Sequence, residues 1–155
     1  MQTDLYETDY FAWTQEQAER LRRMSGDNRI DAAHLAEEVE DLGRSEFYAA
    51  ARFVELILQH FLKIEVSSGL SDPVRHWRKE IRAFRRRLHQ RLTPTLRRKL
   101  LDSLQERYET AVDDADRSLD PAVPDLARRV PACCPYTFEQ VLDSDWHPAP
   151  AAERG

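Results

Sequence analysis

Residues 45–66 read SEFYAAARFVELILQHFLKIEV, the most apolar stretch of the chain. At about 100° per residue, its apolar side chains gather on one wide face of a helix. This face consists of Ala50, Phe53, Val54, Ile57, Phe61 and Ile64, and it is widened by Leu56, Leu58 and Leu62. A stripe this wide is typical of a helix with neighbours on several sides, so residues 45–66 are predicted to form the central helix of a bundle.

Two long helices are predicted after the central one, and each begins beside a proline. Asp72 and Pro73 supply an N-cap and a first-turn proline, and Thr93 with Pro94 repeats this start signal. The first of these helices carries an apolar stripe at regular spacing, formed by Val74, Trp77, Ile81, Phe84, Leu88 and Leu92. The inner stripe of the second is Leu96, Leu100, Leu104, Tyr108, Ala111 and Ala115.

Two helices are predicted before the central one. Thr14 and Gln17 are spaced as a capping box, so a helix is expected to start at Thr14. Asp31 can cap the next helix. A short helix near the C-terminus, residues 137–142, is predicted from the same kind of capping box at Thr137.

The helix that follows Asp31 is expected to bury one apolar stripe. Leu35, Val39 and Leu42 fall on a single helical face, which we expect to point into the core. Gly43 interrupts this pattern, and we expect it to break the helix before the central one begins.

The predicted fold is all-α, an antiparallel bundle of four main helices with short extra N- and C-terminal helices. No stretch shows the alternation of a β-strand. At 155 residues the chain is long enough for one core without metals or disulfides. We expect residues 1–148 to form one domain and residues 149–155 to be a frayed tail.

The composition points to a cytoplasmic protein. The chain has no 18-residue apolar run and its first residues lack the features of a signal peptide, so no membrane association is expected. Its two cysteines, Cys133 and Cys134, are neighbours that match no zinc spacing, which fits a reducing compartment.

The net charge of −5 hides a strong segregation along the chain. Residues 1–46 contain 12 Asp and Glu against 5 Lys and Arg. Residues 75–99 contain 11 Lys and Arg against a single Glu, and residues 100–155 are again acidic. The acidic and basic regions are therefore two separate candidate sites.

The acidic region contributes most of a candidate polar site, formed by Glu37, Glu38, Asp41, Glu46, His60 and Lys63. One hypothesis is that its carboxylates and imidazole converge on a divalent metal ion, as carboxylates do in di-iron bundles. That signature requires Glu-x-x-His pairs on two helices, and His34 with Glu37 is only a single reversed pair. We therefore favour a structural network of ion pairs and hydrogen bonds that fixes the register of the helices.

The basic region contains a candidate anion-binding face, formed by Arg78, Arg82, Arg85 and Arg86. Such a dense positive charge could bind a nucleic-acid backbone. However, Trp77 and Phe84 lie on the apolar stripe, where they cannot stack on bases. We favour a solvated face that the acidic helices partly neutralise.

Motifs distributed over nearly the whole chain give it a family resemblance. They are Leu5-Tyr6 with Asp9 and Trp13, the block Leu35-Ala36-Glu37-Glu38-Val39-Glu40-Asp41-Leu42-Gly43-Arg44-Ser45-Glu46, His60-x-x-Lys63, and Cys134-Pro135-Tyr136-Thr137-x-Glu139-Gln140-x-Leu142. With them the sequence resembles the bacterial "domain of unknown function 29" family, although Ile64 and His76 depart from its pattern. The resemblance implies a compact, all-helical bacterial protein and supplies no activity, substrate or cofactor. It also implies that relatives share the acidic block, His60 and Lys63.

The sequence favours an interaction or accessory protein without catalysis of its own, with a protein partner or a second copy in a homodimer as its ligand. Two alternatives remain open. The first is a metal-dependent enzyme that acts on phosphoester bonds through the carboxylates near Glu38 and Glu46. The second is nucleic-acid binding through the basic helix, residues 75–99, which is the less favoured partner class.

Overall fold

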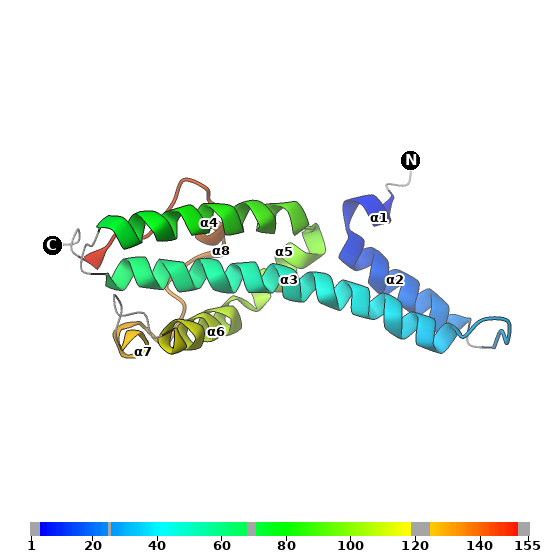
Figure 1. Ribbon diagram of the computed structural model, residues 1–155. Coiled ribbons are helices and arrows are strands. Elements are labelled where there is room, and N and C mark those ends of the chain that lie inside the picture. Colours follow the sequence, from blue (N-terminus) through cyan, green and yellow to red (C-terminus); the bar gives the residue numbers. More distant parts are fainter. Residues whose placement is uncertain (1–3, 25, 68–70, 119–124, 152–155) are drawn as a thin grey trace. The chain divides into compact units, whose positions relative to one another are not determined.

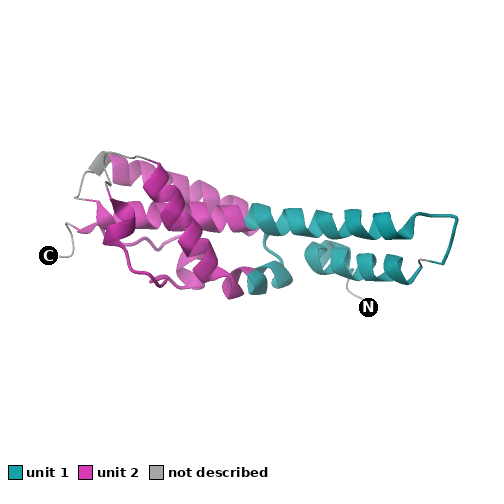
Figure 2. Ribbon diagram, turned by 90° about the horizontal axis from the view of Figure 1, so that it is seen from below, with its two compact units in different colours: residues 1–50, 91–99 teal, residues 51–90, 100–155 magenta. Residues whose placement is uncertain are grey.

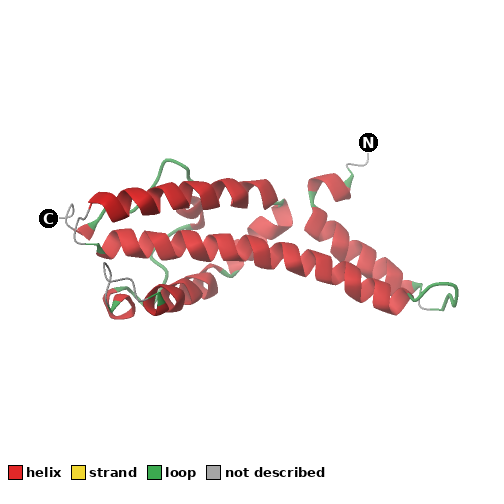
Figure 3. Cartoon of the chain, viewed as in Figure 1, coloured by secondary structure: helices red, strands yellow, loops and turns green. Residues whose placement is uncertain are grey.

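A computed structural model describes residues 4–24, 26–67, 71–118 and 125–151 of the chain (Figure 1). The helices are α1 (Leu5–Thr8), α2 (Tyr10–Arg23), α3 (Ala32–Val66), α4 (Ser71–Arg91), α5 (Pro94–Asp102), α6 (Leu104–Arg117), α7 (Leu126–Arg129) and α8 (Phe138–Leu142). Among the described residues there is no strand (Figure 3), so the predicted all-α fold is confirmed. In the same part of the chain, no helix combines the length and the apolar character needed to cross a membrane.

The chain divides into two compact units, which Figure 2 colours separately. Unit 1 consists of residues 1–50 and 91–99, and unit 2 consists of residues 51–90 and 100–155. Helix α3 supplies its first part to unit 1 and its second part to unit 2. The single domain expected over residues 1–148 stays a prediction. Of the tail expected to fray, residues 149–151 are described and Pro150 is buried.

In unit 1, α2 lies against the first part of α3 through small side chains (Figure 1). Ala32 and Ala36 of α3 are buried, as are Thr14 and Ala18 of α2. A Cβ atom built on Gly43 would lie 2.1 Å from the Thr14 hydroxyl oxygen. The two helices therefore approach so closely at this point that only glycine fits.

The break predicted at Gly43 is wrong, because α3 continues without interruption from Ala32 to Val66. A glycine in a helix interior costs about 1 kcal/mol relative to alanine, which tertiary packing can offset. The close contact with Thr14 gives this glycine a packing role. The cap predicted at Asp31 is confirmed, since its carboxylate accepts a hydrogen bond of 3.3 Å from the His34 backbone N–H.

The prediction that Leu35, Val39 and Leu42 face the core is also wrong. Leu35 is 45% exposed, Leu42 is 50% exposed, and Val39 is half-buried. The buried face is centred near Ala36 and Gly43, roughly 80–100° further round the helix from Leu35. Small residues allow the closest helix contact, so α2 packs on this face and leaves the leucines toward solvent.

Asp9 organises the start of α2 and of α5 within unit 1. Helix α2 begins at Tyr10, four residues earlier than expected. Thr14 therefore lies inside the helix, and its hydroxyl donates a hydrogen bond of 2.7 Å to the Phe11 carbonyl. The buried Asp9 carboxylate accepts hydrogen bonds from the backbone N–H groups of Ala12 (3.1 Å) and Thr95 (2.9 Å). Burial opposes ionisation, but these hydrogen bonds outweigh it and lower the pKa of Asp9.

Residues from Pro94 onward form two helices, α5 and α6, rather than the single helix expected. The backbone of Ser103, at φ −102° and ψ 13°, departs from helical values between them. The stripe expected to face inward is nevertheless buried at Leu96, Leu100, Tyr108, Ala111 and Ala115. Thr93 caps α5 as predicted, since its hydroxyl oxygen accepts a hydrogen bond of 3.3 Å from the Leu96 N–H.

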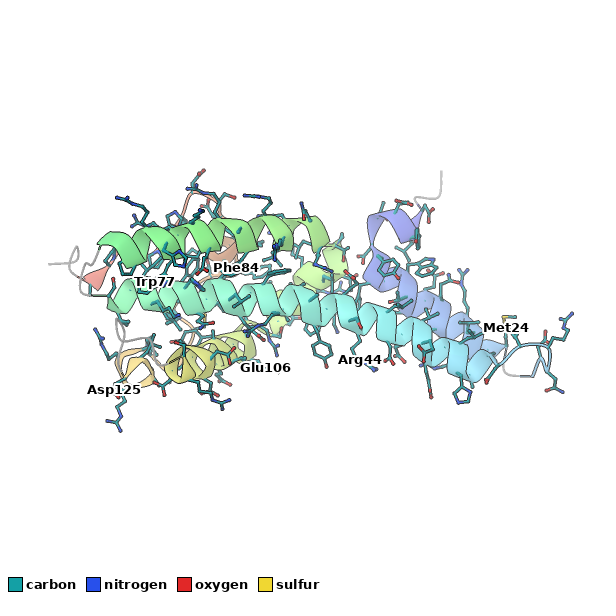
Figure 4. The ribbon with its side chains drawn as sticks, viewed as in Figure 1. Met24, Arg44, Trp77, Phe84, Glu106 and Asp125 are labelled. Carbon is teal, nitrogen blue, oxygen red and sulfur yellow. The ribbon has the colours of Figure 1, made fainter. Side chains whose placement is uncertain are left out.

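Unit 2 is built around the second part of α3, as the apolar run predicts. Val54, Ile57, Leu58, Phe61, Leu62 and Ile64 are at most 1% exposed. Trp77 and Phe84 point from α4 toward α3 (Figure 4). Between α3 and α6, the buried Glu55 carboxylate pairs with Arg107 at 2.8 Å, which adds a polar contact to this apolar core.

The C-terminal residues close over the core of unit 2. The ring of Tyr136 meets Phe61 edge-on with centroids 5.2 Å apart, and its hydroxyl donates to the Glu65 carboxylate. Burial, followed by the neighbouring carboxylate, raises the pKa of this hydroxyl. The capping box predicted at Thr137 is confirmed, because Thr137 and Gln140 exchange hydrogen bonds at the start of α8. The Cys-Pro-Tyr-Thr motif therefore has a structural role.

Gly43→Ala is expected to lower the free energy of unfolding by about 1–3 kcal/mol, as overpacking of a tight contact does. A urea denaturation series measures the change. Gly26→Ala is the matched control, because no atom lies within 4 Å of its added Cβ. If both variants are equally stable, the close contact does not constrain α2 and α3.

Asp9→Asn is expected to remove part of the acid sensitivity of folding. Because the pKa of Asp9 in the folded protein lies below its ordinary value of 3.8, the ionised carboxylate stabilises the fold above that pH. This stabilisation disappears as the pH falls through the folded-state pKa. Free energies of unfolding measured over a pH series should therefore differ most between wild type and variant above about pH 4. A difference that is constant with pH contradicts this role.

Candidate functional site

The acidic block of α3 lies on the surface of unit 1. Glu37, Glu38 and Asp41 are exposed. Asp41 pairs with Arg44 one turn along the same helix, and the half-buried Glu46 pairs with Arg91 at 3.2 Å. Within the described residues, Glu37 and Glu38 make no ion pair. These carboxylates are therefore not a buried network.

His60 and Lys63 belong to the part of α3 that forms unit 2, and both are buried. The His60 Nδ1–H donates a hydrogen bond of 2.7 Å to the Leu56 carbonyl, and Nε2 is hydrogen-bonded to the Glu80 carboxylate. Burial lowers the pKa of His60, and the contact with Glu80 opposes that shift. The ring also packs edge-on against Phe84. Both ring nitrogens are thus occupied by protein groups.

The six residues of the predicted polar site are not brought together in either unit. Four of them, Glu37, Glu38, Asp41 and Glu46, lie in unit 1, while His60 and Lys63 lie in unit 2. Throughout the described residues, no three His, Cys, Asp or Glu side chains form a group that could hold a metal ion. Within unit 1, α3 turns its small-residue face toward α2, and Glu37, Glu38 and Asp41 are exposed.

An apolar row remains exposed on unit 1, and we call it the α3 seam. It consists of Leu35, Val39 and Leu42, and Glu38 lies beside it. The burial of Ala32, Ala36 and Gly43 explains why this row faces solvent. Sequence reasoning missed the seam because it assigned the buried face to the largest side chains. Ala32, Ala36 and Gly43 share one helical face, and this row of small residues was the signal that could have located the seam.

Helix α4 carries a basic face in unit 2. Six of its cations make no ion pair within the described residues: Arg75, Arg78, Lys79, Arg82, Arg86 and Arg87. The neutralisation expected from the acidic helices is confined, among the described α4 arginines, to Arg91 with Glu46. A strong positive charge therefore remains on α4 and is available to an anionic ligand.

A hollow of about 520 Å³ lies beside this face, between α4 and the segment that follows α8. It is lined by Arg82, Arg86, His89, Gln90 and Ser144. Two of the four residues predicted to bind anions, Arg82 and Arg86, thus share one concave site. Sequence reasoning missed Ser144, because its proximity depends on contacts between residues more than fifty positions apart, such as the one between His89 and Leu142. His89 and Gln90 follow Arg86 by three and four residues on α4, and this helical spacing was the signal that could have found them.

Arg85 does not lie on the exposed face as predicted, because it is buried and holds the C-terminal segment. Its Nε donates 2.9 Å to the Val141 carbonyl, and its Nη2 donates 2.8 Å to each of the carbonyls of Gln140 and Trp146. These carbonyls include orphan acceptors at the end of α8. Burial lowers the pKa of Arg85 to about 10, partly offset by Asp143 and Asp145, so the guanidinium remains charged at neutral pH.

Three buried nitrogen atoms in this region have no hydrogen-bond partner among the described residues: Nη1 of Arg85, Nε of Arg78 and Nδ1 of His147. Burial, followed by the charges of Arg85, Arg78 and Arg82, lowers the pKa of His147. Unsatisfied buried polar atoms are rare in native proteins, and a bound water or ion is one of the groups that can satisfy them. The basic face thus includes donors that the chain itself leaves unpaired.

Arg85→Met is expected to lower the free energy of unfolding by roughly 3 kcal/mol or more, because three carbonyls lose a charged donor. Urea denaturation measures the loss, and hydrogen exchange should locate it in residues 138–147. Arg87→Met on the exposed side of the same helix is the control, with an expected change within about 0.5 kcal/mol. Equal effects at both positions contradict the role of Arg85.

The chain shows clear similarity to other proteins. The family model described as "Domain of unknown function DUF29" matches residues 5–147. The crystal structure of an alpha-helical protein of unknown function from Rhodospirillum rubrum is 27% identical, with a TM-score of 0.76 over 93% of this chain and 92% of that one. No curated protein matches the chain. Because the family model covers almost the whole sequence, the chain belongs to the DUF29 family.

Proposed function

We propose that the protein is an interaction protein without catalysis of its own, and that it binds an amphipathic helix of a partner protein on the α3 seam. The observation that carries this proposal is the exposure of Leu35 (45%) and Leu42 (50%) along one helical face. Scattered surface leucines are ordinary, whereas a contiguous apolar row is typical of a binding surface.

The spacing of the seam suits a second helix. Leu35, Val39 and Leu42 are separated by four and then three residues, which is the d–a–d order of a heptad. The e positions of this heptad, Ala36 and Gly43, are already buried toward α2. A partner helix would therefore approach from the g side, where Glu38 lies.

Charge complementarity defines the chemistry of the partner. Glu37 and Glu38 are exposed and make no ion pair within the described residues. A partner helix with Lys or Arg beside its apolar stripe would supply opposite charges at the flanking positions, which set partner choice in coiled coils. A second copy of this chain would bring Glu38 against carboxylates of the same face, so a basic partner is favoured over a homodimer.

The two alternative functions have less support. A metal-dependent phosphoesterase requires converging carboxylates, and no group of three ligands occurs in the described parts of the chain. Nucleic-acid binding is supported by the unpaired cations of α4. It is opposed by the burial of Trp77, which leaves this aromatic side chain unable to stack on bases. The exposed apolar seam is a feature that neither alternative explains.

Two synthetic three-heptad peptides test the proposal, both with Leu at a and d, one with Lys and the other with Glu at e and g. Wild-type protein is expected to bind the Lys peptide, as measured by fluorescence anisotropy of the labelled peptide. Leu42→Glu should weaken this binding at least about tenfold, or ~1.4 kcal/mol. Glu38→Lys should shift the preference toward the Glu peptide.

Leu101→Glu is the matched control, because Leu101 is equally exposed at 50% but lies in unit 2. It is expected to leave peptide binding unchanged. Equal binding of both peptides, or equal losses in the two Leu variants, contradicts the proposal. Sedimentation equilibrium of the protein alone measures its mass in solution and shows whether it forms a homodimer. A dimer that dissociates in the Leu42→Glu variant would contradict the proposal, because the seam would then bind a second copy of this chain.

A further inference from the structure

The unpaired nitrogen atoms near the hollow of unit 2 call for a ligand. Arg85 is only 1% exposed, and its Nη1 group donates to no described residue although its other nitrogens are fully used. Leaving a charged donor buried without an acceptor is costly, and more so than for a neutral group. An acceptor supplied from outside the chain would remove that cost.

Arg82 connects the buried nitrogens with the hollow. It lines the hollow together with Arg86, and it is also one of the three arginines whose charge acts on His147. Arg78, Arg82 and Arg85 follow one another at spacings of four and three along α4, so they share one face of the helix. The exposed and buried donors therefore belong to one basic site.

We propose that this hollow binds a phosphate group, with the Arg82 and Arg86 side chains as its direct ligands, and with Arg78 and Arg85, one helical turn on either side of Arg82, adding positive charge. This inference is independent of the α3 seam, because it concerns unit 2 alone.

The charges and donor types favour phosphate over a single carboxylate. The hollow is lined by Arg82 and Arg86, with Arg78 and Arg85 on the same helix, and the carboxylates that act on these groups are Asp143 and Asp145, so positive charge is in excess. Guanidinium groups form paired hydrogen bonds with phosphate oxygens, and phosphate offers more acceptors than a carboxylate. Because the net charge around the hollow is positive, a phosphate dianion is attracted more strongly than a carboxylate, which carries a single charge.

The size of the hollow indicates what carries the phosphate. At about 520 Å³ it lies within the range of small-molecule sites, and it is larger than one phosphate group requires. His89, Gln90 and Ser144 add polar groups that could contact the rest of a small molecule. Both free phosphate and a small phosphomonoester present the recognised group, and the experiment below separates them.

The test is an NMR titration of the full chain with inorganic phosphate and, separately, with ribose 5-phosphate, at ionic strength held constant with chloride. Saturable shifts of the His147 ring signals are expected, together with a rise in the pKa of His147 as negative charge is added. Arg82→Gln with Arg86→Gln should weaken binding at least about tenfold, which corresponds to ~1.4 kcal/mol. Arg87→Gln, on another face of α4, should leave it unchanged.

Tighter binding of ribose 5-phosphate than of inorganic phosphate supports a phosphomonoester site, and equal binding supports a site for the free ion. Shifts that never saturate overturn the proposal and assign the unpaired nitrogens to buried water. Saturable binding that survives the Arg82 and Arg86 substitutions also overturns it. Because these arginines lie on the surface, circular dichroism of the variant should match wild type and exclude unfolding as the cause.

Discussion

The contact between Gly43 and Thr14 determines which face of α3 is buried in unit 1. Only a residue without a side chain fits beside the Thr14 hydroxyl, and this allows α2 to approach the Ala32, Ala36 and Gly43 face. The orientation of every other residue on this part of α3 follows from that choice. Leu35, Leu42 and the acidic side chains are exposed because the small residues are not.

In unit 2 the same helix packs through large side chains rather than small ones. Its large apolar side chains are buried on several faces, and the polar residues among them have partners: Glu55 pairs with Arg107 and His60 with Glu80. Arg85 follows this pattern, since its burial is supported by three carbonyls from the C-terminal segment. One basic helix therefore provides both a structural arginine and a set of exposed cations, and the structural arginine orders the segment that borders the hollow.

Local sequence signals predicted much of the fold. The apolar run of residues 45–66, the cap at Asp31, the start of α5 at Thr93 and the capping box at Thr137 are all present, because each depends on residues within one or two helical turns. The candidate site was predicted less well. Arg82 and Arg86 line one hollow, but Arg85 is buried, and the residues of the predicted polar site are divided between the two units.

The sequence by itself determined the helical fold class, the buried apolar run within residues 45–66 and the separation of acidic from basic regions, since periodicity, capping and charge are properties of neighbouring residues. The tertiary structure alone decided that Gly43 is a contact and not a break, that Leu35 and Leu42 face solvent, and that Arg85 holds the C-terminal segment. A helical stripe shows which residues share a face, but the neighbour that packs most closely decides which face is buried. In unit 1 this neighbour of α3 is α2, which lies before a loop. In unit 2 the neighbour of Arg85 on α4 is the C-terminal segment, more than fifty residues further along the chain. A local sequence pattern carries no information about contacts at such separations.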